Sequence, residues 1–581
     1  MLFPCSERIP YVLLFLSGLL LDNCVSHTPA EEVNGGLLLP DYFEATVFVD
    51  SLAGKARHIA VRDNGDVFVK LKFQMEGNSM MVLRDKDGDG RADSQKGFAD
   101  YQKEGRWSLE TGVNFYGDYV YYSSMLTVYR QKLEPDEMVP TSPIEIVLQD
   151  DHEHGLHEHI AKPISFDPNG NMYIPFGAPS NACQEPKRIP RAPGLDPCPQ
   201  LEHHAGVWRF DASTLNQTQS DGVRVASGIR SVVAMDWNTL DENLYVVIHG
   251  RDDLLRLFSN HYNAWESAML PSEEFIRVSE GDHYGWPYCY YDQMQGKKVL
   301  APEYGGDGDS IGRCEAYNKP LIGFPGHWAP NGLLFYKGDQ FPERYKGGAF
   351  VAFHGSTIRA PYPQSGYFVG FIPFENGQPT GEWEVFADGF AEVDPIISVN
   401  DAVYRPMGLA EGPDGSLYIG DTEEGRIWKV MYTGSDTVDF GPLQLASMET
   451  RKQAAHIRTP DKVADNLEKE VASAGEQVYN TFCANCHQKD GLGASGRFPP
   501  LAGTDWVTGD KERLIGVILN GMEEPLEISG EMYTLAMPQH GFLSNQEIAD
   551  VLTYIRASFG NDASEVLAQE VKVVRKKSPS L

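Results

Sequence analysis

The sequence predicts two domains of different structural class: a large all-β domain built as a six-bladed β-propeller, followed by a small all-α domain. Three observations support this prediction. The chain has 581 residues, more than one hydrophobic core usually serves. It contains 57 Gly and 37 Pro, which favours many short strands joined by turns. A hairpin-like phrase recurs through residues 40–435, and beyond residue 470 the hydrophobic spacing becomes helical.

The recurring phrase consists of two apolar residues, a Gly-containing turn and an aromatic-rich strand, which is the pattern of a β-hairpin. The clearest copy runs from Leu409 to Ile419 around the turn at Pro413-Asp414-Gly415. The other copies begin at Ile59, Ile164 and Met235, with two looser strand pairs at 113–129 and 333–353. Irregular copies at intervals of tens of residues are typical of propellers, so we expect six blades over residues 37–435. The alternatives are an array of β-sandwiches and an unrelated β-domain.

The C-terminal part of the chain loses the strand pattern. Residues 436–470 are polar and lack strand alternation, so we expect a linker there. An all-α domain is expected over residues 471–562, where Ser544 and Glu547 form a capping box. Its helices are expected just before Cys483, at 511–520 and at 545–559. Residues 563–581 are expected to form a basic tail, with disorder over Lys572–Lys577.

The N-terminus has the features of an export signal. Arg8 precedes an apolar run from Tyr11 to Leu21 that is too short for a stop-transfer helix. We therefore expect a signal peptide at residues 1–27 and a periplasmic or secreted protein that is not integral to the membrane. A buried helix is the alternative for the run, and lipidation of Cys24 stays open because Leu21-Asp22-Asn23-Cys24 is a poor lipobox.

Charge and cysteine content narrow the possible partners and compartments. The formal net charge of −33 argues against nucleic acid and anionic membranes as partners. Four cysteines of the β-domain fall in two pairs, each closing a short loop rich in Pro or Gly, as expected for disulfides in an oxidising compartment. The expected disulfides are Cys183–Cys198 and Cys289–Cys314. Four buried free thiols are the alternative.

A c-type haem attachment motif, Cys483-Ala484-Asn485-Cys486-His487, lies in the helical domain. Two thiolates at this spacing reach both haem vinyl groups, and the next residue places an imidazole on the iron. We therefore predict haem c bound covalently by Cys483 and Cys486 and ligated by His487. Such a protein transfers electrons.

The second axial ligand of the iron is expected to be Met537, in Leu535-Ala536-Met537-Pro538 just before the last helix. Met–His ligation raises the reduction potential, which suits a haem that accepts electrons. Met532 and Met522 are alternative ligands, and a role in the core is the alternative for Met537. With Gly475 and Tyr479 before the motif and Pro499-Pro500-Leu501 after it, residues 472–560 resemble single-haem class I cytochrome c domains. The resemblance implies an electron donor, and the fused β-domain is the candidate.

Short segments of the β-domain occur in an informative order: residues 159–166, Gly228-Ile229-Arg230, His249-Gly250, Tyr284-Gly285-Trp286-Pro287, residues 352–356, and Arg405-Pro406 with residues 413–415. Through these segments residues 40–435 resemble the soluble quinoprotein sugar dehydrogenases, of the glucose dehydrogenase type and more closely of the sorbosone or pyranose dehydrogenase type. The resemblance implies pyrroloquinoline quinone (PQQ) and calcium at the mouth of the propeller. Some members carry a C-terminal cytochrome c.

The resemblance implies a catalytic base seven residues before the apolar end of a strand, and His159, seven before Phe166, fits. An imidazole titrates near neutral pH and can take the proton of a substrate hydroxyl. Residues 152–159 hold four His and two Glu, so a transition-metal site and a structural role are alternatives. His157 is the alternative base.

PQQ has three carboxylates and two quinone oxygens, so its pocket needs cations, and guanidinium pairs with carboxylate at two points. The resemblance implies Arg230 beside the quinone, where it also serves catalysis, and Arg405 and Arg359 on the cofactor. The second Arg of the family pair that begins at Arg405 is missing. Thr357-Ile358 also departs from the related pattern H-G-S-W-N-R, so substrate contacts are expected to differ. Surface salt bridges are the alternative for each arginine.

Two calcium sites are expected. The resemblance implies one beside PQQ, held by the backbone carbonyls of Gly250 and Arg251. The other follows from the acidic residues at alternate positions around a Gly turn in the segment Asp85–Asp93. Its expected ligands are Asp85, Asp87, Asp89 and Asp93. Lys96 stands where an EF-hand would have its closing Glu, and a solvated acidic turn is the alternative.

Together these observations predict an exported quinohaemoprotein dehydrogenase. It would oxidise a sugar or a related alcohol or aldehyde with PQQ and pass electrons through haem c to an external acceptor, a soluble cytochrome or a respiratory chain. Two alternatives stay open: a calcium-dependent, lactonase-like hydrolase on the same scaffold, and a propeller without enzymatic activity that docks the cytochrome to a partner.

Overall fold

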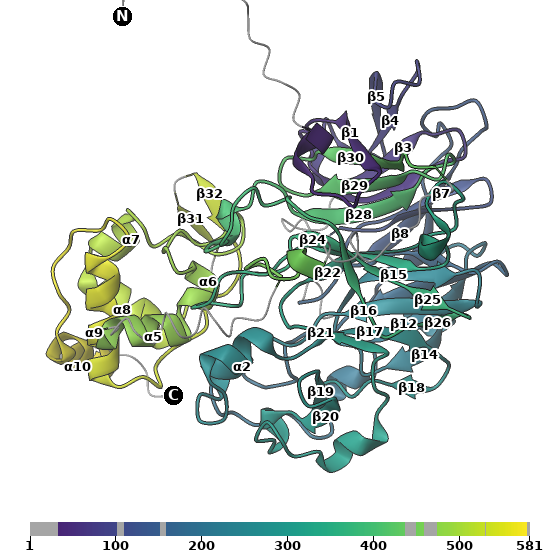
Figure 1. The fold of residues 1–581 in the computed structure, drawn as a ribbon. Coiled ribbons are helices and arrows are strands. Elements are labelled where there is room, and N and C mark those ends of the chain that lie inside the picture. Colours follow the sequence, from purple (N-terminus) through teal and green to yellow (C-terminus); the bar gives the residue numbers. More distant parts are fainter. Residues whose placement is uncertain are drawn as a thin grey trace, which may run out of the picture.

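The computed structural model describes residues 33–101, 110–151, 158–435, 449–457, 473–523, 525–528 and 530–577. The expected signal peptide and His157 lie outside these residues. A large β-domain and a smaller helical domain stand side by side (Figure 1). No helix among the described residues is long and apolar enough to cross a lipid bilayer.

The β-domain contains six antiparallel-based sheets of four or five strands, which are the predicted six blades. Blade I is β2 (Ala56–Val61), β3 (Val67–Met75), β4 (Asn78–Arg84) and β5 (Ser94–Phe98). Blade II is β6 (Val113–Tyr116), β7 (Tyr119–Ser123), β8 (Thr127–Lys132) and β9 (Glu145–Gln149), with β13 (Gln217–Thr218) at its edge. Blade III is β10 (Ser165–Phe166), β11 (Asn171–Phe176), β12 (Gly206–Asp211), β14 (Val223–Ser227) and β18 (Asp282–His283).

The remaining blades follow the same plan. Blade IV is β15 (Val232–Asn238), β16 (Asn243–Ile248), β17 (Glu273–Val278) and β21 (Ile322–Phe324). Blade V is β22 (Pro330–Phe335), β23 (Ala349–Phe353), β24 (Phe368–Ile372) and β27 (Glu384–Ala387). Blade VI is β28 (Pro406–Glu411), β29 (Leu417–Asp421), β30 (Ile427–Tyr432) and β1 (Phe43–Val49). Outside the blades lie α1 (Leu254–Leu257), α2 (Ala264–Met269), β19 (Cys289–Asp292) with β20 (Lys297–Leu300), and β25 (Phe374–Glu375) with β26 (Gln378–Pro379).

The hairpins predicted from the repeated phrase form as antiparallel pairs. In blade I, Ile59 lies opposite Val69, and in blade VI, Leu409 lies opposite Ile419. Alternate residues of these strands pack between neighbouring blades, since a strand directs successive side chains to opposite faces. The expected disulfides Cys183–Cys198 and Cys289–Cys314 are also present.

The first strand of the domain closes the ring. β1 pairs antiparallel with β30, so the two ends of the β-domain share blade VI. Phe43 of β1 makes ring contacts with Phe341, Tyr345, Phe386 and Tyr432, mostly edge to face. The closure therefore removes an open edge and buries an aromatic cluster between blades V and VI.

Each blade is entered at its inner strand, so the starts of the inner strands meet at one end of the propeller, here called the mouth. Arg57, at the start of β2, donates from Nε to the carbonyl of Glu110 before β6. His354 N, after β23, donates to Ala329 O before β22. The residues that precede inner strands and follow second strands therefore lie together at the mouth.

The helical domain contains α5 (Ala474–Phe482), α6 (Ala484–His487), α7 (Asp505–Thr508), α8 (Lys511–Asn520), α9 (Asn545–Ala557) and α10 (Ala568–Lys577), with a hairpin of β31 (Leu526–Ile528) and β32 (Glu531–Tyr533). The capping box predicted at Ser544 and Glu547 begins α9. Gly475 allows α5 to cross α9 closely, because a Cβ there would lie 2.2 Å from the carbonyl oxygen of Asp550.

Within the basic tail at 563–581, the expectation of disorder over Lys572–Lys577 is wrong. Residues 568–577 form α10, whose Val571 and Val574 are buried in the core of the helical domain. The prediction gave weight to the basic residues and overlooked Val571 and Val574, whose i, i+3 spacing places them on one helical face. Of the expected linker, residues 449–457 pack on the propeller: Arg451 donates to the carbonyls of Leu38 and Leu39.

We predict that Phe43→Ala weakens the ring closure. Truncating a buried Phe costs about 3–5 kcal/mol through lost burial and the cavity that remains. The denaturant midpoint of the propeller, followed by tryptophan fluorescence, should fall clearly. The exposed neighbour on the same strand provides the control, and Glu44→Ala should leave the midpoint nearly unchanged. Equal midpoints for the two variants would contradict this account of closure.

Candidate active site and haem attachment site

The residues predicted for the active site gather at the mouth. His159 lies shortly before β10, Arg230 two residues before β15, and Gly250 and Arg251 just after β16. Arg405 directly precedes β28, and Arg359 lies in the segment between β23 and β24. Positions spread over 246 residues of sequence therefore meet because the inner strands start at one end.

His159 is oriented by a backbone contact that fixes its tautomer. Its Nδ1 lies 2.8 Å from the carbonyl oxygen of Ala178, which only accepts, so Nδ1 carries the hydrogen and Nε2 keeps a lone pair. Burial, and next the charge of Arg230, holds the pKa of His159 well below its usual value. Gly177 lets this loop approach, because a Cβ there would lie 2.0 Å from the carbonyl oxygen of His159.

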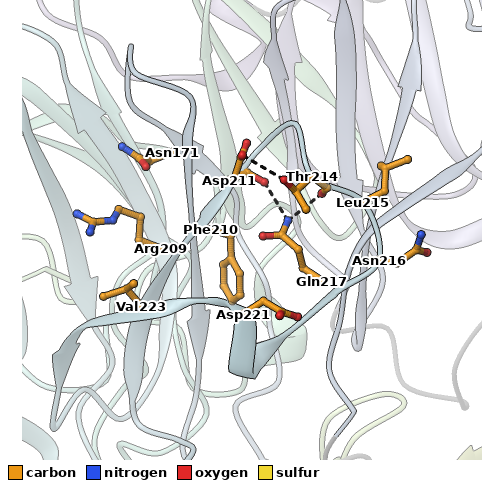
Figure 2. A pocket seen from close by; sticks show the side chains of 10 residues that line it. All are labelled: Asn171, Arg209, Phe210, Asp211, Thr214, Leu215, Asn216, Gln217, Asp221 and Val223. Atoms are coloured by element: carbon orange, nitrogen blue, oxygen red, sulfur yellow. Dashed lines mark hydrogen bonds between the residues drawn. The ribbon is translucent and has the colours of Figure 1, made fainter.

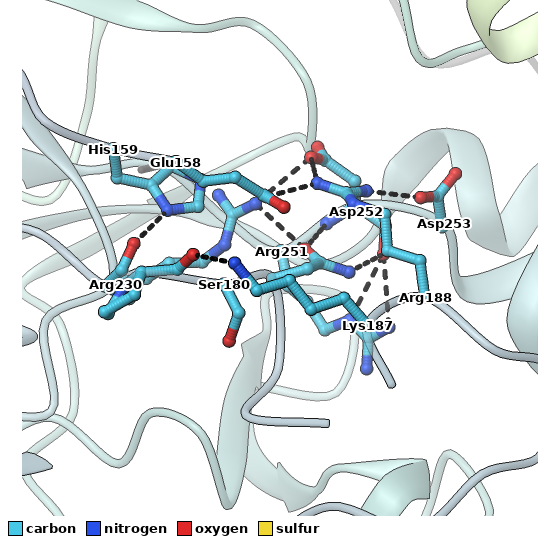
Figure 3. Close-up of polar contacts among 12 residues, drawn as sticks. Glu158, His159, Ser180, Lys187, Arg188, Arg230, Arg251, Asp252 and Asp253 are labelled. Atoms are coloured by element: carbon cyan, nitrogen blue, oxygen red, sulfur yellow. Dashed lines mark hydrogen bonds and ion pairs between the residues drawn. The ribbon is translucent and has the colours of Figure 1, made fainter. Parts of the chain in front are cut away.

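Arg230 is held by three groups of the protein (Figure 3). It donates to the carbonyl of Gly250 at 2.6 Å, to Oδ1 of Asn181 at 2.9 Å and to Oδ2 of Asp252 at 3.1 Å. Its buried Nε has no hydrogen-bond partner among the described residues. One donor is thus available, while the other contacts fix the guanidinium beside His159.

A network of ion pairs surrounds this pair of residues. Glu158, next to His159, lies 2.6 Å from Arg188, which also pairs with Asp253 at 2.5 Å. Asp253 in turn pairs with Arg256 at 2.7 Å. Arg251 pairs with Glu303 rather than facing the mouth as a free charge. In this network four arginines, Arg188, Arg230, Arg251 and Arg256, meet four carboxylates, Glu158, Asp252, Asp253 and Glu303, so the charges balance.

Arg405 and Arg359 lie in a different electrostatic setting. Arg405 donates to the carbonyls of His354 at 3.1 Å and Gly355 at 2.6 Å, and its nearest carboxylate, Glu423, is 3.6 Å away. Arg359 is buried, meets no carboxylate among the described residues, and its Nε has no partner there. Burial lowers the pKa of Arg359 to about 10. Arg359 therefore has no counter-charge among the described residues, and the counter-charge of Arg405 is at the outer limit of an ion pair.

Two cavities of the propeller differ in their relation to the predicted active site. A cavity of about 420 Å³ lies at the end of blade III that is opposite the mouth (Figure 2). Its polar groups satisfy one another: Gln217 donates to the carbonyls of Asp211 and Thr214. At the mouth, a cavity of about 30 Å³ is lined by residues that include Arg230, His249 and Trp286. Its lining includes neither His159 nor Arg359 nor Arg405, so this cavity is only one part of the mouth.

The predicted haem attachment motif lies at the junction of two helices. Cys483 and Cys486 are free thiols, and Cys483 joins α5 to α6. Nδ1 of His487 lies 2.9 Å from the carbonyl oxygen of Pro499, so Nε2 keeps the lone pair that the predicted iron ligation requires. This backbone contact explains the role of the Pro-Pro-Leu segment.

Met537 packs against the core of the helical domain, and its backbone pairs with that of Met522. Met532 is exposed and is poorly placed for a ligand role. Met537 stays the predicted axial ligand.

The helical domain docks on the mouth of the propeller. Gln488, directly after the haem motif, donates to the carbonyl of Thr357, and Gln364 donates to Gln488, both at 3.4 Å. Asn400 donates to the carbonyl of Gly493 at 2.9 Å. Burial, and next the charge of Asp253, raises the pKa of the Cys486 thiol to about 11. The sulfur therefore lies within electrostatic reach of the network around His159.

Sequence reasoning missed two buried groups. Glu273, at the start of β17, accepts from the amides of Gly250 at 2.8 Å and Ala329 at 3.3 Å, and burial raises its pKa to about 7. His540, three residues after Met537, is buried with neither ring nitrogen bonded among the described residues. Only its closeness to Met537 in sequence could have indicated His540, and Glu273 gave no signal.

The two calcium predictions differ in support. The carboxylates of Asp85, Asp87 and Asp89 lie within 4.8 Å of one another, while Asp93 instead accepts from the amide of Lys86. Both oxygens of Asp85 accept from backbone amides, as in an Asx turn. At the mouth, the carbonyl of Gly250 already accepts from Arg230. Both sites stay predictions.

Comparison with known proteins agrees with this architecture. The TrAA12-like family matches residues 38–433, and the cytochrome c family matches residues 472–558. Two solved structures show the same propeller fold, each with a TM-score of 0.55 and covering 68% of this chain. They are a Trichoderma reesei carbohydrate-active enzyme of family AA12 (18% identical, 98% of that chain) and the PQQ domain of Coprinopsis cinerea pyranose dehydrogenase (17%, 97%).

The helical domain has relatives of its own. Cytochrome c-552 of Thermus thermophilus is 39% identical over 113 residues, covering 18% of this chain and 85% of the relative. The cytochrome c subunit of the Gluconobacter oxydans quinone alcohol dehydrogenase is 41% identical over 108 residues, covering 18% of this chain and 22% of the relative.

Fold and site together define an oxidoreductase-type propeller, of the sugar dehydrogenase kind, joined to a haem c domain. The chain belongs to the TrAA12-like family through its propeller and carries a C-terminal cytochrome c domain.

We predict that Met537→Ala removes the sulfur ligand of the haem iron. The reduction potential should fall and the weak sulfur-to-iron absorption band at the red edge of the oxidised spectrum should disappear, because Met ligation raises the potential. Met532→Ala provides the control and should leave both unchanged. A band that persists in Met537→Ala and is lost in Met522→Ala would assign the ligand to Met522.

Proposed function

We propose that the protein is an exported quinohaemoprotein dehydrogenase that oxidises a sugar or a related alcohol or aldehyde with PQQ and passes electrons through haem c to an external acceptor. The observation that carries the proposal is the docking of the haem attachment helix on the mouth. The residue after the haem motif, Gln488, bonds to the segment that holds Arg359. Both redox sites would then lie in one continuous interior.

The donor set at the mouth fits PQQ. Arg359 meets no carboxylate among the described residues, and Arg405 shares its nearest carboxylate, Glu423 at 3.6 Å, with Lys72, so both cations keep charge for an anionic ligand. Arg230 retains one unpartnered Nε beside His159. When bound, PQQ supplies an acceptor for two electrons and haem c supplies one-electron transfer.

His159 would take the proton of the substrate hydroxyl at Nε2. Its Nδ1 hydrogen is already committed to Ala178, so the free lone pair is held in one orientation. The nearby charge of Arg230 disfavours protonation of the imidazole and would stabilise negative charge that develops on oxygen at the mouth. Base and cation thus have separate roles.

Three related proposals concern the location of the protein and its two calcium sites. Disulfides and covalent haem favour an extracytoplasmic location. Calcium beside Gly250 and Arg251 would have to displace Arg230 from the Gly250 carbonyl. Calcium at Asp85, Asp87 and Asp89 would stabilise the turn without reaching the mouth.

The proposed reaction can be observed on the haem. We expect the haem-loaded protein, given PQQ, calcium and a panel of sugars and aldehydes, to show reduction of the haem spectrum that needs both PQQ and substrate. His159→Ala should lower the rate at least 100-fold because the base is lost, while PQQ remains bound. His203→Ala, at an exposed surface position, should behave as the parent protein.

Other outcomes separate the alternatives. A haem that stays oxidised with every substrate contradicts the proposal. Hydrolysis of lactones under the same conditions, with no change in the haem, would assign the propeller to a hydrolase. If neither reaction occurs and a partner reduces the haem directly, the propeller serves docking alone.

The pH dependence of turnover tests the assignment of the base. Because the pKa of His159 is held well below 6.5, the imidazole stays neutral and able to accept a proton at and below neutral pH. The acid limb of kcat/KM should therefore lie below pH 6.5. An acid limb above that pH would mean that another group, such as Glu273 with its pKa of about 7, controls the reaction.

A further inference from the structure

One side of the mouth, where blade VI meets blade I, carries more positive than negative charge. Arg57 lies in β2, Lys72 in β3, and Arg405 directly before β28. Nζ of Lys72 and Nη1 of Arg405 each lie 3.6 Å from the same carboxylate oxygen of Glu423. Two cations therefore share one carboxylate, and the charge of Glu423 is also the strongest attraction acting on Arg57.

Arg57 is the least satisfied of the three. Its one hydrogen bond among the described residues runs from Nε to the carbonyl of Glu110 at 3.2 Å. The carboxylate of Glu110 is taken by Lys70, whose Nζ lies 2.5 Å away. Arg57 is nonetheless buried, with 8% of its surface exposed. The two terminal nitrogens of Arg57 make no hydrogen bond among the described residues, so they are available to a ligand.

The cations also repel one another. Burial, and then the charges of Arg57, Arg405 and Lys55, lower the pKa of Lys72 to about 8 even though Glu423 opposes the shift. Burial lowers the pKa of Arg57 to about 10, with Arg405 among the causes. An anion bound between these side chains would relieve both the repulsion and the unpaired burial.

The opposite side of the mouth offers no such surplus. There Arg230 and three neighbouring arginines pair with four carboxylates, and the unpartnered donor of Arg230 is its Nε. An anionic ligand with more than one carboxylate would therefore be oriented with its carboxylates toward blades VI and I. Position 407, two residues after Arg405, is a fully buried Met and supplies no cation there.

We propose that Arg57 and Lys72 of blade I, together with Arg405 of blade VI, bind the carboxylates of PQQ or of a similarly planar polycarboxylate. This inference rests on the proposed function for the identity of the ligand. Arg57 presents a planar fork that pairs with a carboxylate at two points, whereas Lys72 supplies a point charge. Blade I thus supplies the cation that the sequence of blade VI lacks.

The test measures binding rather than turnover. The haem-loaded protein is dialysed to equilibrium against PQQ, and bound PQQ is determined by absorbance. Arg57→Gln and Lys72→Gln should each weaken binding about 10- to 100-fold, since each loses a charge-assisted contact. Arg62→Gln, at the other end of strand β2 and bonded to the carbonyls of Glu134 and Glu137, and Lys337→Gln remove the same charge elsewhere and should change binding less than 2-fold.

Two further measurements distinguish loss of the anion site from loss of the fold. Arg57→Lys should recover part of the affinity, which a variant that had merely lost its fold would not. Benzene-1,2,4-tricarboxylate, which is inert to redox chemistry, should compete with PQQ in the parent protein and bind Arg57→Gln weakly.

Each outcome has a distinct meaning. If the parent binds PQQ and the Arg57 and Lys72 variants match their controls, this inference fails while the proposed function stands. If the parent binds the tricarboxylate in an Arg57-dependent manner but not PQQ, the anion site stands and the proposed cofactor fails. If neither ligand binds the parent protein, both proposals are overturned.

Discussion

The pairing of β1 with β30 is the constraint on which the rest of the structure depends. It joins residues near the start of the β-domain to residues near its end and makes them one sheet. Without this pairing blade VI would lack its outer strand and the ring would have an open edge. Closure also sets blade VI against blade I, which is how Arg405 and Glu423 come to face Arg57 and Lys72. The charge surplus at the mouth is thus a consequence of closing the ring.

The two sides of the mouth differ in whether their charges are paired. On the side around Arg230 and Asp252, where positive and negative charges balance, hydrogen bonds and ion pairs hold His159 and its loop in one orientation. The side with surplus cations leaves its charges available to a ligand. A uniform ring of arginines would bind an anion in many orientations, whereas an asymmetric one selects a single orientation relative to the base.

Much of this could be predicted from the sequence, for local reasons. Hairpins depend on turn residues such as Asp414-Gly415, and haem attachment depends on five consecutive residues, so both leave complete local patterns. The disulfides also close short loops. The partners of His159 and Arg230 could not be predicted, since Ala178, Asn181 and Asp252 belong to other loops and meet them only in the closed ring. The helix α10 was missed because its basic residues outnumber the two valines that bury it.

The docking of the helical domain explains why neither domain can be understood alone. Gln488 is fully buried although it directly follows the haem ligand His487, because Thr357 and Gln364 of blade V cover it. The same segment of blade V carries Arg359, whose guanidinium meets no carboxylate among the described residues. A ligand that completes Arg359 would therefore act on the segment that holds the haem helix in place. If Arg359 binds the ligand as proposed, occupancy of the mouth would stabilise the segment that contacts the haem helix.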